Sequence, residues 1–172
     1  QMNGSASAGT NGLAGNDITV RGYLGTKTLD VAAGNDAKDV VDLINGSSDE
    51  YGVTAKAVTH LKFGDVSNDG TVTLKIGQNG SSSSLTTVTG TVTTTDLSNL
   101  RDAINAVSGD TGVTESNLDG SNANLLLKDA DGNDIVLGDF THSTTSATAD
   151  VNAYNFTASG TATGSATNTV LQ

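Results

Sequence analysis

The chain repeats one pattern of residues at a spacing of sixty positions, and this repeat restricts its fold more than any other feature. A short stretch rich in Asp and apolar residues leads to an Ile-Asn pair and then to Gly-Val-Thr, and the same order occurs twice. Self-similarity at a fixed spacing indicates one supersecondary unit built more than once. We therefore expect two successive copies of one unit. The aligned segments are 36–40 and 96–100, Ile44-Asn45 and Ile104-Asn105, and Gly52-Val53-Thr54 and Gly112-Val113-Thr114.

Each copy contains a short segment with helical periodicity. Between Ala37 and Ile44, and again between Leu97 and Val107, apolar residues recur three and four positions apart. Helices of this length do not persist alone, so each must lie against a sheet. The predicted helices are about 36–45 and about 96–108, with Asp36 and Asp96 as N-caps and Gly46 and Gly109 as stops.

The rest of each copy alternates apolar and polar residues, which is typical of half-buried strands. Two Asp-Gly pairs, Asp69-Gly70 and Asp131-Gly132, are separated by 62 positions and predict hairpins, because both residue types tolerate a positive φ. The segments that alternate are 18–20, 28–31, 53–57 and 72–76 in the first copy and 88–92, 113–114, 125–127, 135–137 and 151–156 in the second.

These patterns predict an α+β fold of two tandem β-β-α-β-β units, with mainly antiparallel sheet and one short helix in each. We expect residues 1–80 to form the first unit, and residues 81–172 to form the second, together with a Thr/Ser/Ala-rich C-terminal strand and tail. Residues 78–84 are the expected link, and the last dozen residues have little to bury. With 35% hydrophobic and 3% aromatic residues, two small cores fit better than one large core. Either two separate units or one shared sheet agrees with the repeat.

Composition excludes several classes of function. The formal net charge is −11, with no cluster of Lys or Arg, so neither nucleic acid nor membrane is expected as a partner. There is no cysteine for a disulfide, a thiolate metal site or a nucleophile. No apolar run approaches the roughly 20 residues that cross a bilayer.

No group of residues has the pattern of a catalytic, cofactor or metal site, so we expect none of these and no enzyme. His60 and His142 are the only histidines, and both are interpreted as surface or strand residues. The oxygen-rich stretch Asp129 to Asp134 has some features of a calcium loop, but it lacks the full spacing, and a hairpin turn explains it better. Gly25 to Thr28 lacks the glycines of a phosphate-binding loop.

The order of helix, Ile-Asn, loop and Gly-Val-Thr resembles a repeat from the central, hypervariable and surface-exposed part of bacterial flagellins, found also in related axial proteins such as the filament cap. The resemblance covers about residues 16–140, and the second copy departs from it at Glu115, where the first has Ala55. It implies a structural, extracellular outer domain on the flagellar filament, serving motility and forming a variable antigenic surface. It also implies secretion through the flagellar channel, and recognition by antibodies, phages or a host surface.

The long helices by which such proteins polymerise are not in this sequence. We therefore expect a segment of a longer chain, which contacts other flagellin subunits through those missing helices and is a monomer by itself. Two alternatives remain open: an outer domain of a cap or hook-associated protein, and an adhesin-type binding module. Few aromatic residues argue against sugar-stacking platforms. The glycosylation candidates are Asn3, Asn45, Asn79 and Asn155 from the Asn-x-Ser/Thr pattern, and Ser81 to Ser84 from the resemblance.

Overall fold

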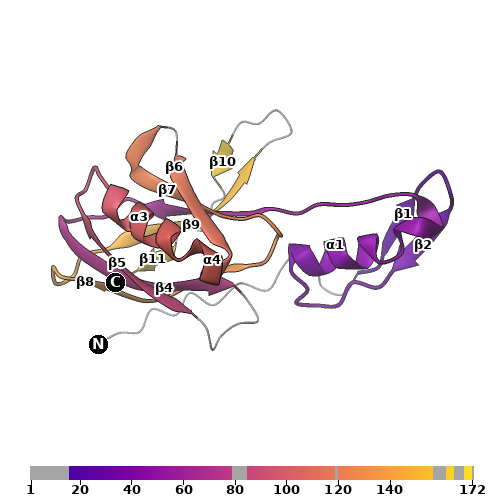
Figure 1. Cartoon of the computed structure of the whole chain (residues 1–172), viewed down its shortest axis with the longest axis horizontal. Helices are drawn as coiled ribbons and strands as arrows, with labels where there is room; N and C mark the ends of the chain where they lie inside the picture. Colours follow the sequence, from indigo (N-terminus) through magenta and orange to yellow (C-terminus); the bar gives the residue numbers. More distant parts are fainter. Residues whose placement is uncertain (1–15, 79–84, 119, 157–161, 165–168, 172) are drawn as a thin grey trace. The chain divides into compact units, whose positions relative to one another are not determined.

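The computed structural model describes residues 16–78, 85–118, 120–156, 162–164 and 169–171, and it combines antiparallel sheets with short helices (Figure 1). This confirms the α+β class. The chain forms two compact units. Among the described residues, the small unit contains 16–59 and 130–134, and the large unit contains those of 60–129 and 135–171. The structure thus divides the chain near residue 60 rather than at the expected residue 80, because the strand after residue 69 contributes its apolar face to the core of the large unit.

The small unit begins with a hairpin of β1 (Ile18–Arg21) and β2 (Thr26–Leu29), closed by a bond from the Gly22 N–H to the Gly25 carbonyl at 2.9 Å. Helix α1 (Ala37–Asn45) and the single turn α2 (Ser48–Tyr51) follow. The buried apolar side chains of this unit are Leu29, Val31 and Tyr51.

Helix α1 begins and ends where the sequence predicts. The Asp36 carboxylate accepts from the N–H of Asp39 at 2.8 Å, and the Asp39 carboxylate accepts from the N–H of Asp36 at 3.1 Å, which forms a reciprocal capping box. At the other end the Gly46 N–H donates to the Asp42 carbonyl at 2.8 Å. Asn35 and the Asp36 N–H both donate to Asp39 and keep the pKa of that carboxyl below its usual value.

The prediction of a strand at 53–57 is wrong. This segment is extended, and Val53, Ala55 and Ala57 are more buried than the residues between them, but no strand of the described chain pairs with it. The alternation of apolar and polar residues in this segment therefore reflects burial of one side of the extended chain. It does not indicate the ladder of hydrogen bonds that defines a sheet.

The large unit contains two antiparallel sheets. In one sheet, β4 (Gly70–Gln78) lies between β5 (Thr86–Val92) and β8 (Ile135–His142). The order of the other sheet is β10-β9-β3-β7-β6, and β11 also pairs with β9. Its strands are β3 (Thr59–Gly64), β6 (Val113–Leu118), β7 (Ser121–Asp129), β9 (Ala149–Phe156), β10 (Ala162–Gly164) and β11 (Thr169–Leu171). Strand β9 confirms the expected additional strand, and two short strands lie in the C-terminal region predicted to have little to bury.

Neither Asp-Gly pair forms the predicted hairpin, because the strands on its two sides belong to different sheets. Asp69 instead accepts the N–H of Thr94 through its carboxylate at 2.8 Å. Gly132 has a φ of +86° and lies in the 130–134 segment of the small unit, where its carbonyl accepts the N–H of Lys38 at 3.1 Å. The chain bends at both places, but it leads to a strand of the other sheet instead of returning alongside the strand before it.

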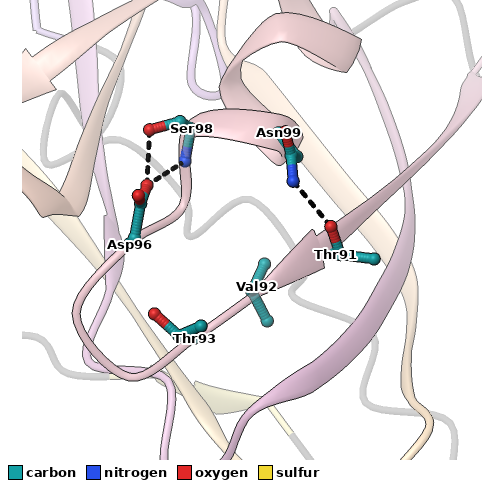
Figure 2. A pocket seen from close by; sticks show the side chains of 6 residues that line it. All are labelled: Thr91, Val92, Thr93, Asp96, Ser98 and Asn99. Carbon is teal, nitrogen blue, oxygen red and sulfur yellow. Dashed lines mark hydrogen bonds between the residues drawn. The ribbon is translucent and has the colours of Figure 1, made fainter.

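The second predicted helix is α3 (Ser98–Ala106), followed by the single turn α4 (Ser108–Thr111). The carboxylate of Asp96 accepts from both the N–H and the hydroxyl of Ser98, as predicted for a capping residue (Figure 2). Leu97, however, occupies the N-cap position itself. Asp96 therefore accepts the first helical N–H, that of Ser98, from the position before the N-cap.

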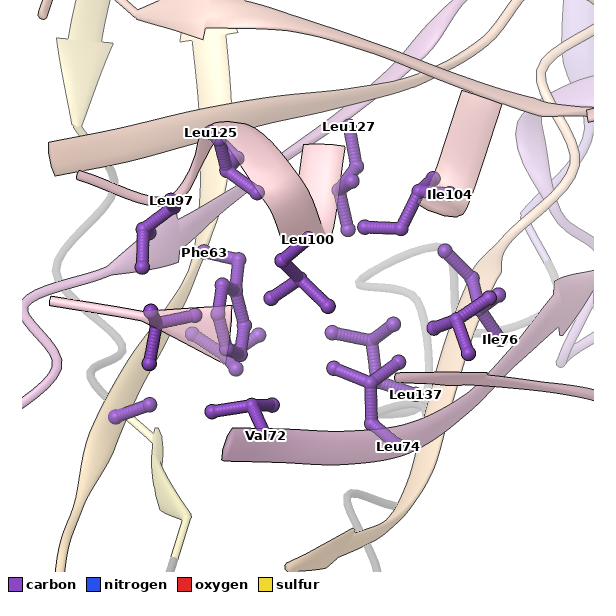
Figure 3. Packing of buried hydrophobic residues seen from close by; sticks show 14 of the residues in the cluster. Phe63, Val72, Leu74, Ile76, Leu97, Leu100, Ile104, Leu125, Leu127 and Leu137 are labelled. Carbon is purple, nitrogen blue, oxygen red and sulfur yellow. The ribbon is translucent and has the colours of Figure 1, made fainter. Parts of the chain in front are cut away.

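Apolar side chains from α3 and both sheets meet in the core of the large unit (Figure 3). Gly90 of β5 allows the helix to come close, since a Cβ there would lie 2.6 Å from the Cα of Leu100. Each buried Leu or Ile contributes roughly 1.5 to 3 kcal/mol, so most apolar stabilisation lies in this unit. The largest buried members are Phe63, Leu74, Ile76, Leu97, Leu100, Ile104, Leu125 and Leu127.

Candidate functional site

The Asn of the first Ile-Asn pair binds the main chain of a residue ten positions later. The Asn45 Oδ1 accepts from the N–H of Ala55 at 2.8 Å, and the Asn45 Nδ2 donates to the carbonyl of Ala55 at 3.1 Å. One side-chain amide therefore satisfies both polar groups of one extended residue, as a neighbouring strand would. We call this pair of hydrogen bonds an asparagine clamp.

The second copy contains the same clamp. The Asn105 Oδ1 accepts from the N–H of Glu115 at 2.8 Å, and the Asn105 Nδ2 donates to the carbonyl of Glu115 at 3.2 Å. The donor, the acceptor and the ten-residue separation are all equivalent to those of the first clamp. The two copies therefore share a three-dimensional interaction as well as a sequence pattern.

A matched turn brings each clamp to its target. Gly52 and Gly112 both adopt a positive φ, 75° and 68°, and donate their N–H groups to Ser48 and Ser108 at 2.6 Å and 2.9 Å. Glycine suits this left-handed position because it has no Cβ to clash. Just before each glycine a buried side chain with a hydroxyl group, Tyr51 or Thr111, donates that hydroxyl to a carbonyl at the end of the preceding helix.

The clamp fixes geometry and supplies no reactive group. An amide side chain is neither a strong nucleophile nor a general base at neutral pH, and both polar atoms of Asn45 and Asn105 are engaged. What the arrangement does is hold a helix, a tight turn and an extended segment in one register. This is a structural role.

The two copies differ most at the clamped residue. Ala55 is replaced by Glu115, a residue that is 8% exposed and whose carboxylate oxygens have no hydrogen-bond partner of good geometry. Burial raises the pKa of Glu115 to about 7, while the Arg101 charge and the N–H of Leu126 oppose the rise only in part. Asp102 adds to the rise. A half-protonated acid near neutral pH is thus built into the second copy.

Both histidines lie on strands, as expected. The Nδ1 of His142 accepts the N–H of Thr144 at 2.9 Å, which assigns the proton to Nε2, and Nε2 lies 3.1 Å from the carbonyl of Asn68. His60 is half-buried, and burial together with the charge of Lys128 lowers its pKa. These environments account for both side chains as parts of the fold.

The stretch from Asp129 to Asp134 is split between the two compact units. Asp129 is fully buried and accepts from the Gln78 Nε2, whereas Asp134 belongs to the small unit. The pKa of Asp134 is raised by burial and by the charges of Asp36 and Asp39. Across the described residues no three His, Cys, Asp or Glu side chains gather in a way that could hold a metal ion.

A recess of about 140 Å³ lies where β5 leads into α3 (Figure 2). Its polar lining is engaged internally: the Asn99 Nδ2 donates to the Thr91 Oγ1 at 2.6 Å, and the bonds from Ser98 lower the pKa of Asp96. The recess therefore contains a helix cap and a side-chain bond that fasten α3 to β5. Val92 and Thr93 complete the lining.

The remaining candidates are also accounted for or lie outside the described residues. Lys27 binds the Ser47 Oγ at 3.0 Å and pairs with Glu50, which gives it a structural role. Asn3, Asn79 and Ser81 to Ser84 lie outside the described residues, and Asn155 lies in β9. The side-chain nitrogen of Asn45 is already a donor in its clamp. Among the described helices, none is long and apolar enough to cross a membrane.

Comparison with known families matches residues 17–68 to a family described as the flagellin hook IN motif. The match contains the whole first clamp, from Asn45 to Ala55, and does not include the second copy. It confirms a flagellin-type region in this part of the chain. A search of curated proteins finds no match.

Proposed function

We propose that this flagellin-related chain is a structural outer domain of flagellin, the subunit of the bacterial flagellar filament. The observation that carries the proposal is the flagellin-type region at residues 17–68, in which the Asn45 clamp holds the Ile-Asn turn. The flagellin family is structural rather than enzymatic, and its filament is extracellular. In this proposal the domain lies on the filament surface, serves motility and presents a variable antigenic face.

The second copy is proposed to be a second motif of the same kind. Support comes from the Asn105 clamp, from the paired positive-φ glycines and from the matching single-turn helices α2 and α4. Corresponding backbone and side-chain features at one spacing are hard to obtain by chance in unrelated segments. The chain is thus proposed to present two motifs in tandem, one in each compact unit.

The physical character of the chain agrees with such a role. The net charge of −11 repels neighbouring copies and keeps a densely packed surface soluble. The absence of cysteine suits a chain that is secreted unfolded and folds outside the cell. Contacts with other flagellin subunits are assigned to parts of the protein outside this chain, and antibodies, phages or a host surface are proposed to meet its exposed face.

A second candidate is an outer domain of a hook-associated or cap protein. The specific observation in its favour is that the matched motif is described as a hook motif as well as a flagellin motif. Both candidates place the chain on the flagellum, and they differ in where along the flagellum it lies.

Immunogold electron microscopy of the source bacterium separates these outcomes. Antibodies raised against the 172-residue chain should label filaments along their whole length if the chain is part of flagellin. Label confined to the hook junction or to the tip would replace this assignment with the second candidate. Absence of label from intact flagella, with label elsewhere on the cell, would overturn both. Serum absorbed with the purified chain is the control.

The isolated chain is proposed to be a monomer, because its polymerising contacts are assigned to other parts of the protein. Sedimentation velocity at increasing protein concentration should give one species with the mass of 17.2 kDa. A stable oligomer at micromolar concentration would contradict this part of the proposal.

A further inference from the structure

The extended segment 53–58 of the small unit lacks a partner strand that its counterpart in the second copy has. The counterpart, β6 (Val113–Leu118), lies sixty positions later and pairs antiparallel with β7, so that Thr114 faces Lys128 and Ser116 faces Leu126. In the described part of the chain, segment 53–58 has no such ladder. The motif thus has a paired strand after its turn in the second copy, and an unpaired extended segment at the equivalent position in the first copy.

The clamp determines which edge of the segment is free. In an extended chain the N–H and C=O of successive residues point to opposite edges. Asn105 occupies the edge on which Glu115 presents its polar groups, and β7 occupies the opposite edge. Asn45 holds Ala55 in the same way, so the opposite edge of the first copy is formed by Thr54, Lys56 and Val58.

This opposite edge is open among the described residues. The structure records no hydrogen bond from the backbone of Thr54, Lys56 or Val58 to another described residue. All three residues are exposed, and Val58 is 45% exposed despite being apolar. An unpaired row of N–H and C=O groups is a template for another strand.

Helix α1 is also less covered than its counterpart. Helix α3 buries Leu100 and Ile104, whereas α1 buries no side chain fully and its Leu43 is 37% exposed. Beside segment 53–58 lies a hollow of about 370 Å³, lined by Val41 and Asn45 of α1, by Ala55 to Val58, and by Ala130 and Asp131. The hollow offers space for side chains next to the free edge.

We propose that the Thr54–Lys56–Val58 edge accepts an extended β-strand of a partner polypeptide. The second copy shows the chemistry of the occupant, since β7 places Leu125 and Leu127 at alternate positions against its motif. The exposed Lys56 adds a preference for an acidic residue opposite it. This inference follows from the clamp geometry and is independent of the flagellar assignment.

The same edge of a second copy is a poor occupant. Pairing that engages all three outward residues of two antiparallel copies places Thr54 opposite Val58 and Lys56 opposite Lys56. Like charges directly opposite each other destabilise a sheet, and a lysine on an open edge is a common way to prevent self-association. The partner is therefore a strand of different sequence.

Amide hydrogen exchange of the full chain, read by NMR, tests the proposal. The probes are a synthetic peptide with the β7 sequence Ser121–Asp129 and the same peptide with the L126E change, which places a carboxylate opposite Lys56 in the β6–β7 register. Without peptide, the amides of Thr54, Lys56 and Val58 should exchange almost as fast as in an unfolded chain. Saturating peptide should slow these three amides by about tenfold and leave Ala55 and Ala57 unchanged, since only alternate amides face the added strand.

The acidic peptide should bind about two- to five-fold more tightly than the parent peptide, and K56E should reverse that order. K56P removes one outward N–H and should abolish binding while the Ala55 amide stays protected by Asn45, which shows that the unit remains folded. Three outcomes would overturn the proposal: protection of Thr54, Lys56 and Val58 before any peptide is added, binding that does not alternate along the segment, and undiminished binding to K56P.

Discussion

The side chain of Asn105 replaces a neighbouring strand for one residue, accepting from the N–H of Glu115 at 2.8 Å and donating to its carbonyl at 3.2 Å. The carboxyl of the residue it holds is buried, with a pKa raised to about 7. The same amide-to-backbone pair recurs between Asn45 and Ala55. The Ile-Asn pattern therefore has a physical meaning: the Asn sets the register of the extended segment after the turn, and in the second copy the buried Ile104 also anchors the helix in the core.

Removal of either clamp should destabilise its own unit. N105A should lower the free energy of unfolding by about 2 kcal/mol, because two backbone groups in a partly buried strand lose their partner. N45A should cost about 1 kcal/mol, since its hydrogen bonds are more exposed to water. Urea unfolding followed through NMR signals of residues in each unit measures both values.

An exposed asparagine in the same region serves as the matched control. N99A removes only a side-chain bond to Thr91 and should cost less than N105A. If N99A and N105A lowered the free energy of unfolding equally, the clamp would contribute no more to stability than an ordinary surface amide does.

The stability of the large unit should depend on the protonation of Glu115. Its pKa is raised in the folded chain from the usual 4.5 to about 7, so the folded state binds the proton more tightly than the unfolded state. The free energy of unfolding should therefore be highest below pH 4.5 and fall as the pH rises to about 7. E115Q should remove this dependence and stabilise the unit by about 2 kcal/mol near pH 8, with little effect at low pH.

The control for that experiment is D49N, which changes an exposed carboxyl on α2. Thermal unfolding of both variants across this pH range should show a pH-dependent gain for E115Q alone. If wild-type stability rose between pH 4.5 and 7 at the signals of the large unit, and E115Q had no effect on that slope, the carboxyl would not be buried as described.

Two glycines near α3 should respond in opposite directions to an added methyl group. G90A places a Cβ 2.6 Å from the Cα of Leu100, where backbone must move, and should cost about 2 kcal/mol. G109A meets nothing within 4 Å and lies in the helical turn α4, so it should be neutral or stabilise by up to about 1 kcal/mol. Melting temperatures of the two variants compare them directly, and a neutral G90A would show that α3 does not press on β5.

The capping box of α1 should contribute measurably to the free energy of unfolding of the small unit. D36A leaves the N–H of Asp39 without its acceptor and should destabilise the small unit by about 1 kcal/mol. D30A removes an exposed carboxylate of equal charge outside the cap and is the control. Equal unfolding midpoints for the two variants, read at small-unit signals, would exclude a role for the cap.

Local patterns in the sequence predicted the elements well. Apolar spacing and the capping aspartates gave α1 and α3 within two residues at each end, and alternation located β4, β5, β7 and β8. Pairing was harder to predict. Asp69-Gly70 and Asp131-Gly132 both turn the chain, but whether a turn closes a hairpin depends on which strands compete for the same partner, and that is decided by the whole core.

The candidate site was partly visible in the sequence. The equal spacing from Ile-Asn to Gly-Val-Thr identified the repeated residues of the two copies. It did not reveal the hydrogen bonds between Asn45 and Ala55, because Ala55 takes part only through its backbone and its side chain therefore carries no pattern. The buried state of Glu115 was hidden for a related reason: an isolated Glu in a polar segment reads as solvent-exposed until the fold of the large unit buries it.

The most direct test of the account is amide exchange at Ala55 and Glu115 in the wild-type chain and in the two single asparagine variants. If one motif is built twice, both amides exchange slowly in the wild type, N45A releases Ala55 alone, and N105A releases Glu115 with Ala55 still protected. Fast exchange at either amide in the wild type, or protection that survives loss of its own asparagine, would contradict the claim that the two copies are held by the same clamp.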